Sequence, residues 1–93
     1  MKDEERLAAQ HYSSLVEAIS RDYHLTCPIT ILKTAVLGYE RRTRLRFNSL
    51  FAIDEFMVSL SLKDASGQIQ TAEIEFGIWE SDGNLEVFES KLT

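Results

Sequence analysis

Two hydrophobic periodicities divide the chain. Apolar residues recur at three- and four-residue steps over the first quarter, and at two-residue steps from about residue 42 onward. The first spacing is typical of an amphipathic helix, and the second of antiparallel strands buried on one face. We therefore predict one α+β domain over residues 1–93, in which a single long N-terminal helix packs on an antiparallel sheet of four to five strands.

The N-terminal periodic segment predicts a helix over about residues 3–24. Its apolar stripe consists of Ala8, Tyr12, Leu15, Val16, Ile19 and Tyr23. The acidic residues at positions 3–5 favour the positive end of the helix dipole. Pro28 cannot simply continue a helix and biases Cys27 toward an extended backbone, so the helix is expected to end before them.

Residues 28–39 are compatible with two structures. Apolar residues such as Ile31, Ala35 and Val36 fit a helical spacing, but the segment is also rich in β-branched residues, which favour an extended chain. We interpret it as a strand over 29–37, followed by a turn at Gly38. A second helix beginning at Pro28 is the alternative.

The alternating segments predict a meander of hairpins. The expected strands after the first lie at about 42–48, 55–63, 68–80 and 84–90. A three-residue turn at 65–67 pairs Val58 with Ile74 and Phe56 with Phe76, so that apolar side chains face each other. A two-residue turn at Asp82-Gly83 would pair Ile78 with Val87 and place Phe88 beside Gly77.

This register places a second group of residues on the sheet face away from the helix. Met57, Trp79 and Phe88 lie there, surrounded by carboxylates that include Glu73, Glu75 and Glu86. Aromatic residues and Met inside a polar rim are typical of protein-binding surfaces. The sequence therefore predicts partner binding at these six residues, unless segment 28–39 or a second copy of the chain covers them.

A run of arginines supports a different hypothesis. Arg41 is followed by Arg42, Arg44 and Arg46, and these last three share one strand face, where they could bind phosphate or nucleic acid. The competing interpretation is a cross-strand ladder with Glu73 and Glu75. The net charge of −5 and the pI of about 4.9 argue against nucleic acid as a partner.

Catalytic and metal-binding patterns are scarce. His24 and Cys27 are not joined by a second pair of ligands at zinc-finger spacing, so neither a metal nor a cofactor is expected. No catalytic constellation stands out either, and we predict a protein that is not an enzyme; a small enzyme using His11 or His24 is the third hypothesis. The apolar run at 50–53 is expected to form a contact loop or to pack under the helix end.

These observations favour a small acidic protein-interaction module that docks on another protein. An inhibitor, immunity-type protein, adaptor or chaperone would fit this description. The longest mainly apolar run is too short for a membrane span, and the N-terminal residues do not resemble a signal peptide, so a cytoplasmic location is expected. A homodimer is also possible, because the outer strands of a sheet can pair with another chain.

Overall fold

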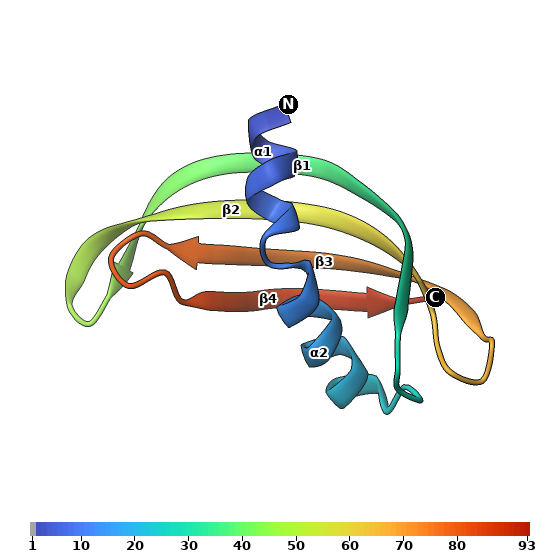
Figure 1. The fold of residues 1–93 in the computed structure, drawn as a ribbon. Helices are drawn as coiled ribbons and strands as arrows, with labels where there is room; N and C mark the ends of the chain where they lie inside the picture. Colours follow the sequence, from blue (N-terminus) through green and yellow to red (C-terminus); the bar gives the residue numbers. More distant parts are fainter. Residues whose placement is uncertain (1) are drawn as a thin grey trace.

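The computed structural model describes residues 2–93 and has an α+β architecture (Figure 1). Two short helices precede one four-stranded antiparallel sheet with the strand order β1-β2-β3-β4. The elements are α1 (Lys2–Ala9), α2 (Tyr12–Tyr23), β1 (Thr30–Arg46), β2 (Ser49–Lys63), β3 (Ile69–Trp79) and β4 (Leu85–Leu92). The expected antiparallel meander is confirmed, with four strands.

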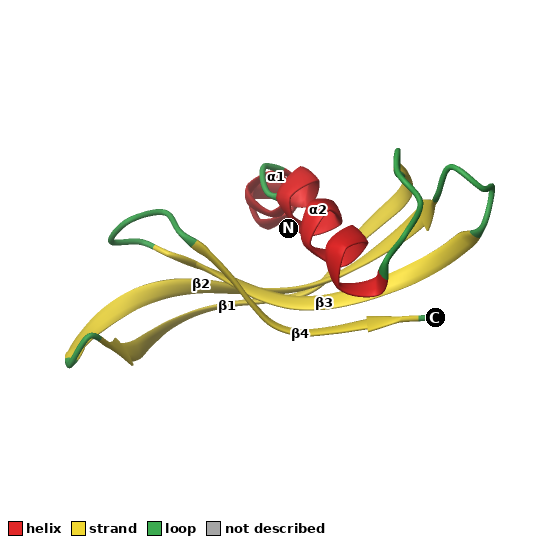
Figure 2. Ribbon diagram, turned by 90° about the horizontal axis from the view of Figure 1, so that it is seen from below, coloured by secondary structure: helices red, strands yellow, loops and turns green. Residues whose placement is uncertain are grey.

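Both helices lie on the same side of the sheet (Figure 2). They cross the strands diagonally, so that α1 contacts β1 and α2 contacts β4. Their buried residues Ala8, Leu15 and Ile19 join Phe56, Phe76 and other inward-facing strand residues in the main core. Within residues 2–93, no element covers the opposite side of the sheet, which we call the outer face.

The expectation of one helix over residues 3–24 is wrong. The helix is interrupted at Gln10 and His11, where the His11 amide donates to the Ala8 carbonyl at 3.0 Å in a tighter turn. Neither residue is Gly or Pro, so local propensity does not require the break. We attribute it to packing: two helical pieces of different direction follow the curved sheet, and Ala8 in α1 and Leu15 in α2 are both fully buried.

The two strands expected at 29–37 and 42–48 are one continuous strand, β1. Gly38 is not a turn but pairs with Met57 within the ladder. The β1–β2 register shifts between Ile31 and Lys33 and again between Val36 and Gly38. Each bulge accommodates one extra leucine and bends the strand, which explains why the alternation is irregular before residue 39.

The β2–β3 register is the expected one, with Val58 opposite Ile74 and Phe56 opposite Phe76. The β3–β4 register differs by two residues. The Trp79 amide donates to the Asn84 carbonyl at 2.9 Å, which leaves a loop of four residues instead of two. Phe76 is therefore the partner of Val87. Near the turn this shift of two keeps the side chains of β4 on their expected faces. A bulge between Glu75 and Phe76 then shifts the register by one residue and turns Glu89 and Lys91 to the outer face.

The β1–β2 hairpin ends in a two-residue turn that was not expected. Phe47 and Asn48 both have positive φ, at 53° and 62°. Phe47 is 80% exposed, and its neighbours Leu45 and Leu50 are about 70% exposed, so the tip of this hairpin is apolar and uncovered. Asn and Gly normally occupy such turns, because bulky side chains disfavour the left-handed region.

We expect Phe47→Asn to stabilise the fold by about 1 kcal/mol, because Asn tolerates a positive φ better than Phe does. Little buried surface is lost, although the contact of the Arg46 guanidinium with the Phe47 ring at 4.9 Å is removed. Phe47→Ala removes the same ring without easing the backbone and should give no such gain. Urea titration of both variants measures the difference, and equal stabilities would contradict it.

Candidate functional site

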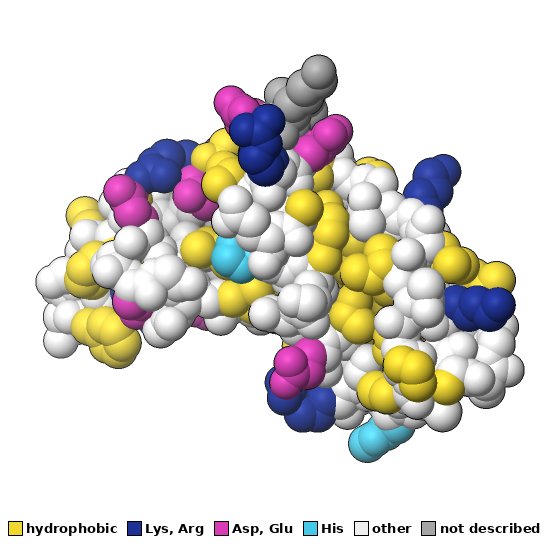
Figure 3. All heavy atoms as spheres, in the orientation of Figure 1, with side chains coloured by type: hydrophobic (Ala, Val, Ile, Leu, Met, Phe, Trp, Pro, Cys, Tyr) yellow, Lys and Arg dark blue, Asp and Glu magenta, His cyan; other side chains and the backbone are white. Residues whose placement is uncertain are grey.

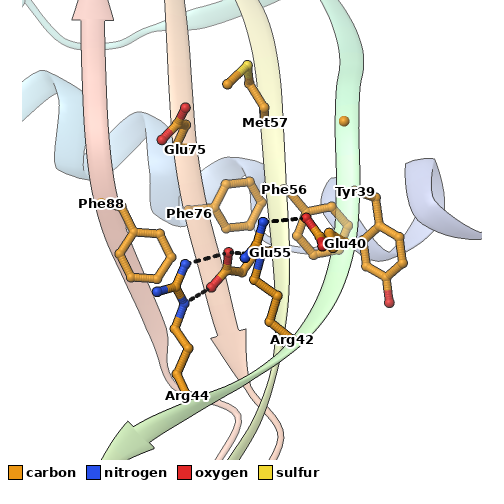
Figure 4. A pocket seen from close by; sticks show the side chains of 11 residues that line it. Tyr39, Glu40, Arg42, Arg44, Glu55, Phe56, Met57, Glu75, Phe76 and Phe88 are labelled. Carbon is orange, nitrogen blue, oxygen red and sulfur yellow. Dashed lines mark hydrogen bonds and ion pairs between the residues drawn. The ribbon is translucent and has the colours of Figure 1, made fainter.

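The outer face contains a hollow, which we call the cleft, with a volume of about 450 Å³ (Figure 4). It crosses all four strands. Its lining combines apolar side chains with carboxylates and guanidinium groups, and consists of Gly38, Tyr39, Glu40, Arg42, Arg44, Glu55, Phe56, Met57, Glu75, Phe76 and Phe88. The curvature of the sheet and the small residue in β1 leave this space open.

Met57 and Phe88 are the exposed large apolar residues of the cleft. Their side chains are 38% and 40% exposed, and they come from β2 and β4. Gly38 is the cross-strand partner of Met57 and has no atom within 4 Å of the position that a Cβ would occupy. A larger residue there would fill part of the cleft. The arrangement leaves the apolar surface of Met57 and Phe88 accessible between charged walls.

Two arginines form one wall of the cleft and are held by carboxylates. Arg42 donates to Glu40 at 2.6 Å, and its Nε lies 3.3 Å from Glu55. Arg44 makes two hydrogen bonds to Glu55, one of them at 3.0 Å, and its guanidinium lies 5.6 Å from the centre of the Phe88 ring (Figure 4). The hydrogen bonds with Glu55 raise the pKa of Arg44.

The cross-strand ladder exists, but the expectation of Glu73 and Glu75 as its carboxylates was wrong. Glu55 takes their place, because β1 pairs with β2, and β3 lies one strand further away. Arg46 is separate from the cleft. It pairs with Asp82 at 2.9 Å, and its guanidinium lies 4.6 Å from the Trp79 ring.

Trp79 is buried, with 4% of its surface exposed. The guanidinium of Arg46 covers its ring, its indole Nε1 donates to Glu86 at 3.1 Å, and its cross-strand partner is Ile53. Trp79 therefore supports the outer face from within and does not offer a free aromatic surface. The sequence indicated its face correctly but left open whether it was covered.

A second small core, which was not expected from the sequence, lies on the outer face. Ile53 is fully buried, and its Cδ1 atom lies 2.6 Å from the position that a Cβ of Gly77 would occupy. The Phe88 ring approaches the same position to 2.9 Å, so the expected covering of Gly77 by Phe88 is confirmed. The expectation for residues 50–53 was wrong, because they belong to β2. The sequence feature that could have indicated this core is the fully apolar run at 50–53, at the end of a strand.

A smaller hollow of about 60 Å³ adjoins the cleft and shares Met57 and Glu75 with it. Glu73, Glu89 and Lys91 supply its other charged groups. The structure thus brings together four of the six expected partner-binding residues, namely Met57, Phe88, Glu73 and Glu75. Glu86 instead accepts the Trp79 hydrogen bond and does not line either hollow.

The helix side of the molecule has a different hollow, of about 490 Å³, between α2 and the chain leading into β1. Its mostly apolar lining includes Ser13, Val16, Cys27 and Ile29. Figure 3 shows hydrophobic side chains gathered beside the helices on this face. This hollow competes with the cleft as a place where a partner could bind.

Further candidate functional features are the two histidines, metal-binding groups and membrane-spanning helices. Burial lowers the pKa of His11, whose ring centre lies 6.4 Å from that of Phe76, whereas His24 is exposed at the end of α2. Across residues 2–93, no group of three or more His, Cys, Asp or Glu side chains could hold a metal ion. Neither described helix is long and apolar enough to cross a membrane.

Comparison of the chain with protein-family models, with curated proteins and with solved structures found no match. Functional inference therefore depends on the geometry of the outer face and on its charges.

Proposed function

We propose that this protein is a docking module that binds another protein through the outer face of its sheet. Inhibitors, immunity-type proteins, adaptors and chaperones all act in this way without catalysis. The observation that carries the proposal is the cleft, in which Met57 and Phe88 remain exposed between charged side chains while the other side of the sheet is covered by helices. Partly exposed apolar residues within a charged rim are the usual anatomy of such sites.

The arrangement also supports a preformed surface. Arg44 is fixed between Glu55 and the Phe88 ring, and the buried residues Ile53 and Trp79 lie beneath the same end of the face. Side chains that are already ordered lose less conformational entropy when a partner binds. We therefore expect the outer face to change little on binding.

Anion binding through Arg42, Arg44 and Arg46 is the weaker alternative. Each of these arginines already contacts at least one carboxylate of the same chain. A phosphate group would have to compete with those carboxylates at every position.

A homodimer through the outer face is a further alternative, and it would appear directly as a doubled mass in light scattering.

Capture of the natural partner from the native host tests the proposal. We expect Met57→Asp/Phe88→Ser to lose the protein that the unchanged chain retains, because it replaces the exposed apolar surface of the cleft by polar groups. The matched control is Leu7→Asp/Tyr23→Ser, which removes two residues of similar exposure, 41% and 38%, from the helices. Retention by the cleft variant, together with loss by the helix variant, would overturn the proposal. Circular dichroism establishes that both variants are folded.

A further inference from the structure

We infer that the segment of the partner that occupies the cleft is cationic, with a lysine or arginine side chain next to an apolar residue. The inference rests on the proposed docking function and names the chemistry of the occupant. Charge complementarity between this segment and the outer face carries it. The cleft and the adjoining hollow contain five carboxylates and three cationic groups, namely Glu40, Glu55, Glu73, Glu75, Glu89, Arg42, Arg44 and Lys91.

The positive charges in the cleft are already neutralised. Arg42 contacts both Glu40 and Glu55, and Arg44 contacts Glu55 through two nitrogen atoms. These four residues form a closed network along one wall (Figure 4). An incoming anion would have to displace a carboxylate of the protein, so this wall does not favour an acidic segment.

On the β3–β4 side of the outer face, two carboxylates have no cation opposite them in the ladder. Glu75 and Glu89 are direct cross-strand partners in β3 and β4. Like charges in this position are destabilising. Glu73 faces Lys91 in the same ladder. Among the ion pairs and side-chain hydrogen bonds formed within residues 2–93, none involves the side chain of Glu73, Glu75 or Glu89. A cation placed between these carboxylates would replace repulsion by charge-assisted hydrogen bonds.

The apolar residues lie where the stem of such a side chain would pass. Met57 is the cross-strand partner of Glu75 and lines both hollows, and Phe88 closes the cleft on the β4 side (Figure 4). Long cationic side chains pack their methylene groups on apolar surface while their charged ends reach a polar group. The flexible thioether of Met57 suits a contact of this kind.

The net charge of the protein acts in the same direction. The net charge of −5 is the sum of +2 over residues 1–46 and −7 over residues 47–93, and it attracts a cationic partner and speeds association at low salt. This long-range attraction does not depend on the cleft. The test must therefore separate it from binding at Glu75 and Glu89.

Three fluorescent synthetic peptides provide the probe. They share the same leucine residues and differ only at alternate positions, which hold lysine, glutamine or glutamate. Fluorescence anisotropy at about 0.15 M salt is expected to show at least ten-fold tighter binding of the lysine peptide than of the glutamine peptide, and the weakest binding of the glutamate peptide. Tighter or equal binding of the glutamine or glutamate peptide would overturn the inference, as would the absence of binding by all three.

Two variants with the same net charge separate local binding from general attraction. We expect Glu75→Gln/Glu89→Gln to weaken binding of the lysine peptide about ten-fold, and Asp3→Asn/Asp22→Asn, on the exposed side of the helices, to change it less than two-fold. Equal weakening by both would overturn the inference. A third variant, Met57→Asp, distinguishes failure of the cationic inference from failure of the docking proposal. If a neutral or acidic peptide binds and Met57→Asp abolishes its binding, the docking face is supported and only the cationic occupant is wrong. If Met57→Asp leaves the affinity of a bound peptide unchanged, the docking face itself is wrong.

Discussion

Replacing Trp79 with alanine is expected to lower the free energy of unfolding by about 3–5 kcal/mol, the usual range for truncating a buried tryptophan. The indole is 4% exposed, and its Nε1 donates to Glu86. Its loss would leave a cavity next to Ile53 and remove the aromatic surface beneath the Arg46 guanidinium. Urea unfolding followed by circular dichroism measures the effect.

Met57→Ala is the control for this prediction. Met57 lies on the same face but is 38% exposed, so its truncation should cost much less than that of Trp79. If Trp79→Ala cost no more than Met57→Ala, the second core on the outer face would not contribute as described. The comparison also shows which residues can serve as surface probes: Trp79 cannot, because its substitution is expected to perturb the fold.

Gly77→Val is expected to destabilise the protein by about 1–3 kcal/mol, the typical cost of overpacking a filled site. A Cβ at this position would lie 2.6 Å from the Ile53 Cδ1 atom and 2.9 Å from the Phe88 ring. Ile53 is fully buried and has little room to move, while Phe88 is half-exposed and would be pushed toward the cleft. Thermal unfolding, converted to free energy at one temperature, measures the cost.

Gly38→Val provides the matched control for Gly77. Both glycines lie in strands and line or border the cleft, but the position of a Gly38 Cβ has no atom within 4 Å. Valine there should be neutral or slightly stabilising, because it favours an extended chain. Similar destabilisation by both substitutions would mean that the close contacts at Gly77 do not matter.

The β2–β3 hairpin could be predicted from sequence because two independent signals agree. Gly67 has a positive φ of 89°, and the resulting register places Val58 opposite Ile74. In the β3–β4 hairpin the apolar match did not fix the register, because Val87 faces an apolar residue both in the expected pairing with Ile78 and in the observed pairing with Phe76, and the loop proved two residues longer. The Asp82 side chain accepts a hydrogen bond from the Asn84 amide at 3.0 Å inside this loop, a local interaction that the Asp82-Gly83 dipeptide alone does not specify.

The errors at the N-terminal end have a different origin. The helix break at His11 occurs without Gly or Pro, so it follows from packing on a curved sheet and not from local propensity. In β1, Gly38 suggested a turn but lies within a bulged strand. Bulges depend on the partner strand, and the alternation of apolar residues in one segment does not reveal them.

The sequence predicted the sheet face on which the candidate site lies, but not the cleft itself or the cover over Trp79. Strand alternation predicted that Met57, Trp79 and Phe88 share one face of the sheet, and in the structure all three lie on that face. The cover over Trp79 comes from Arg46, a residue of another hairpin, and no local pattern links the two. The cleft likewise depends on how β1 pairs with β2, which brings Arg42 and Arg44 to Glu55.

Contact of a partner protein with the outer face of the sheet can be detected by site-specific photo-crosslinking in the native host. The photoreactive residue is placed at position 57 in the cleft or at position 13 in the helix-side hollow. We predict a covalent adduct with another protein from position 57 and none from position 13. An adduct from position 13 alone would contradict docking at the outer face and assign it to the helix side.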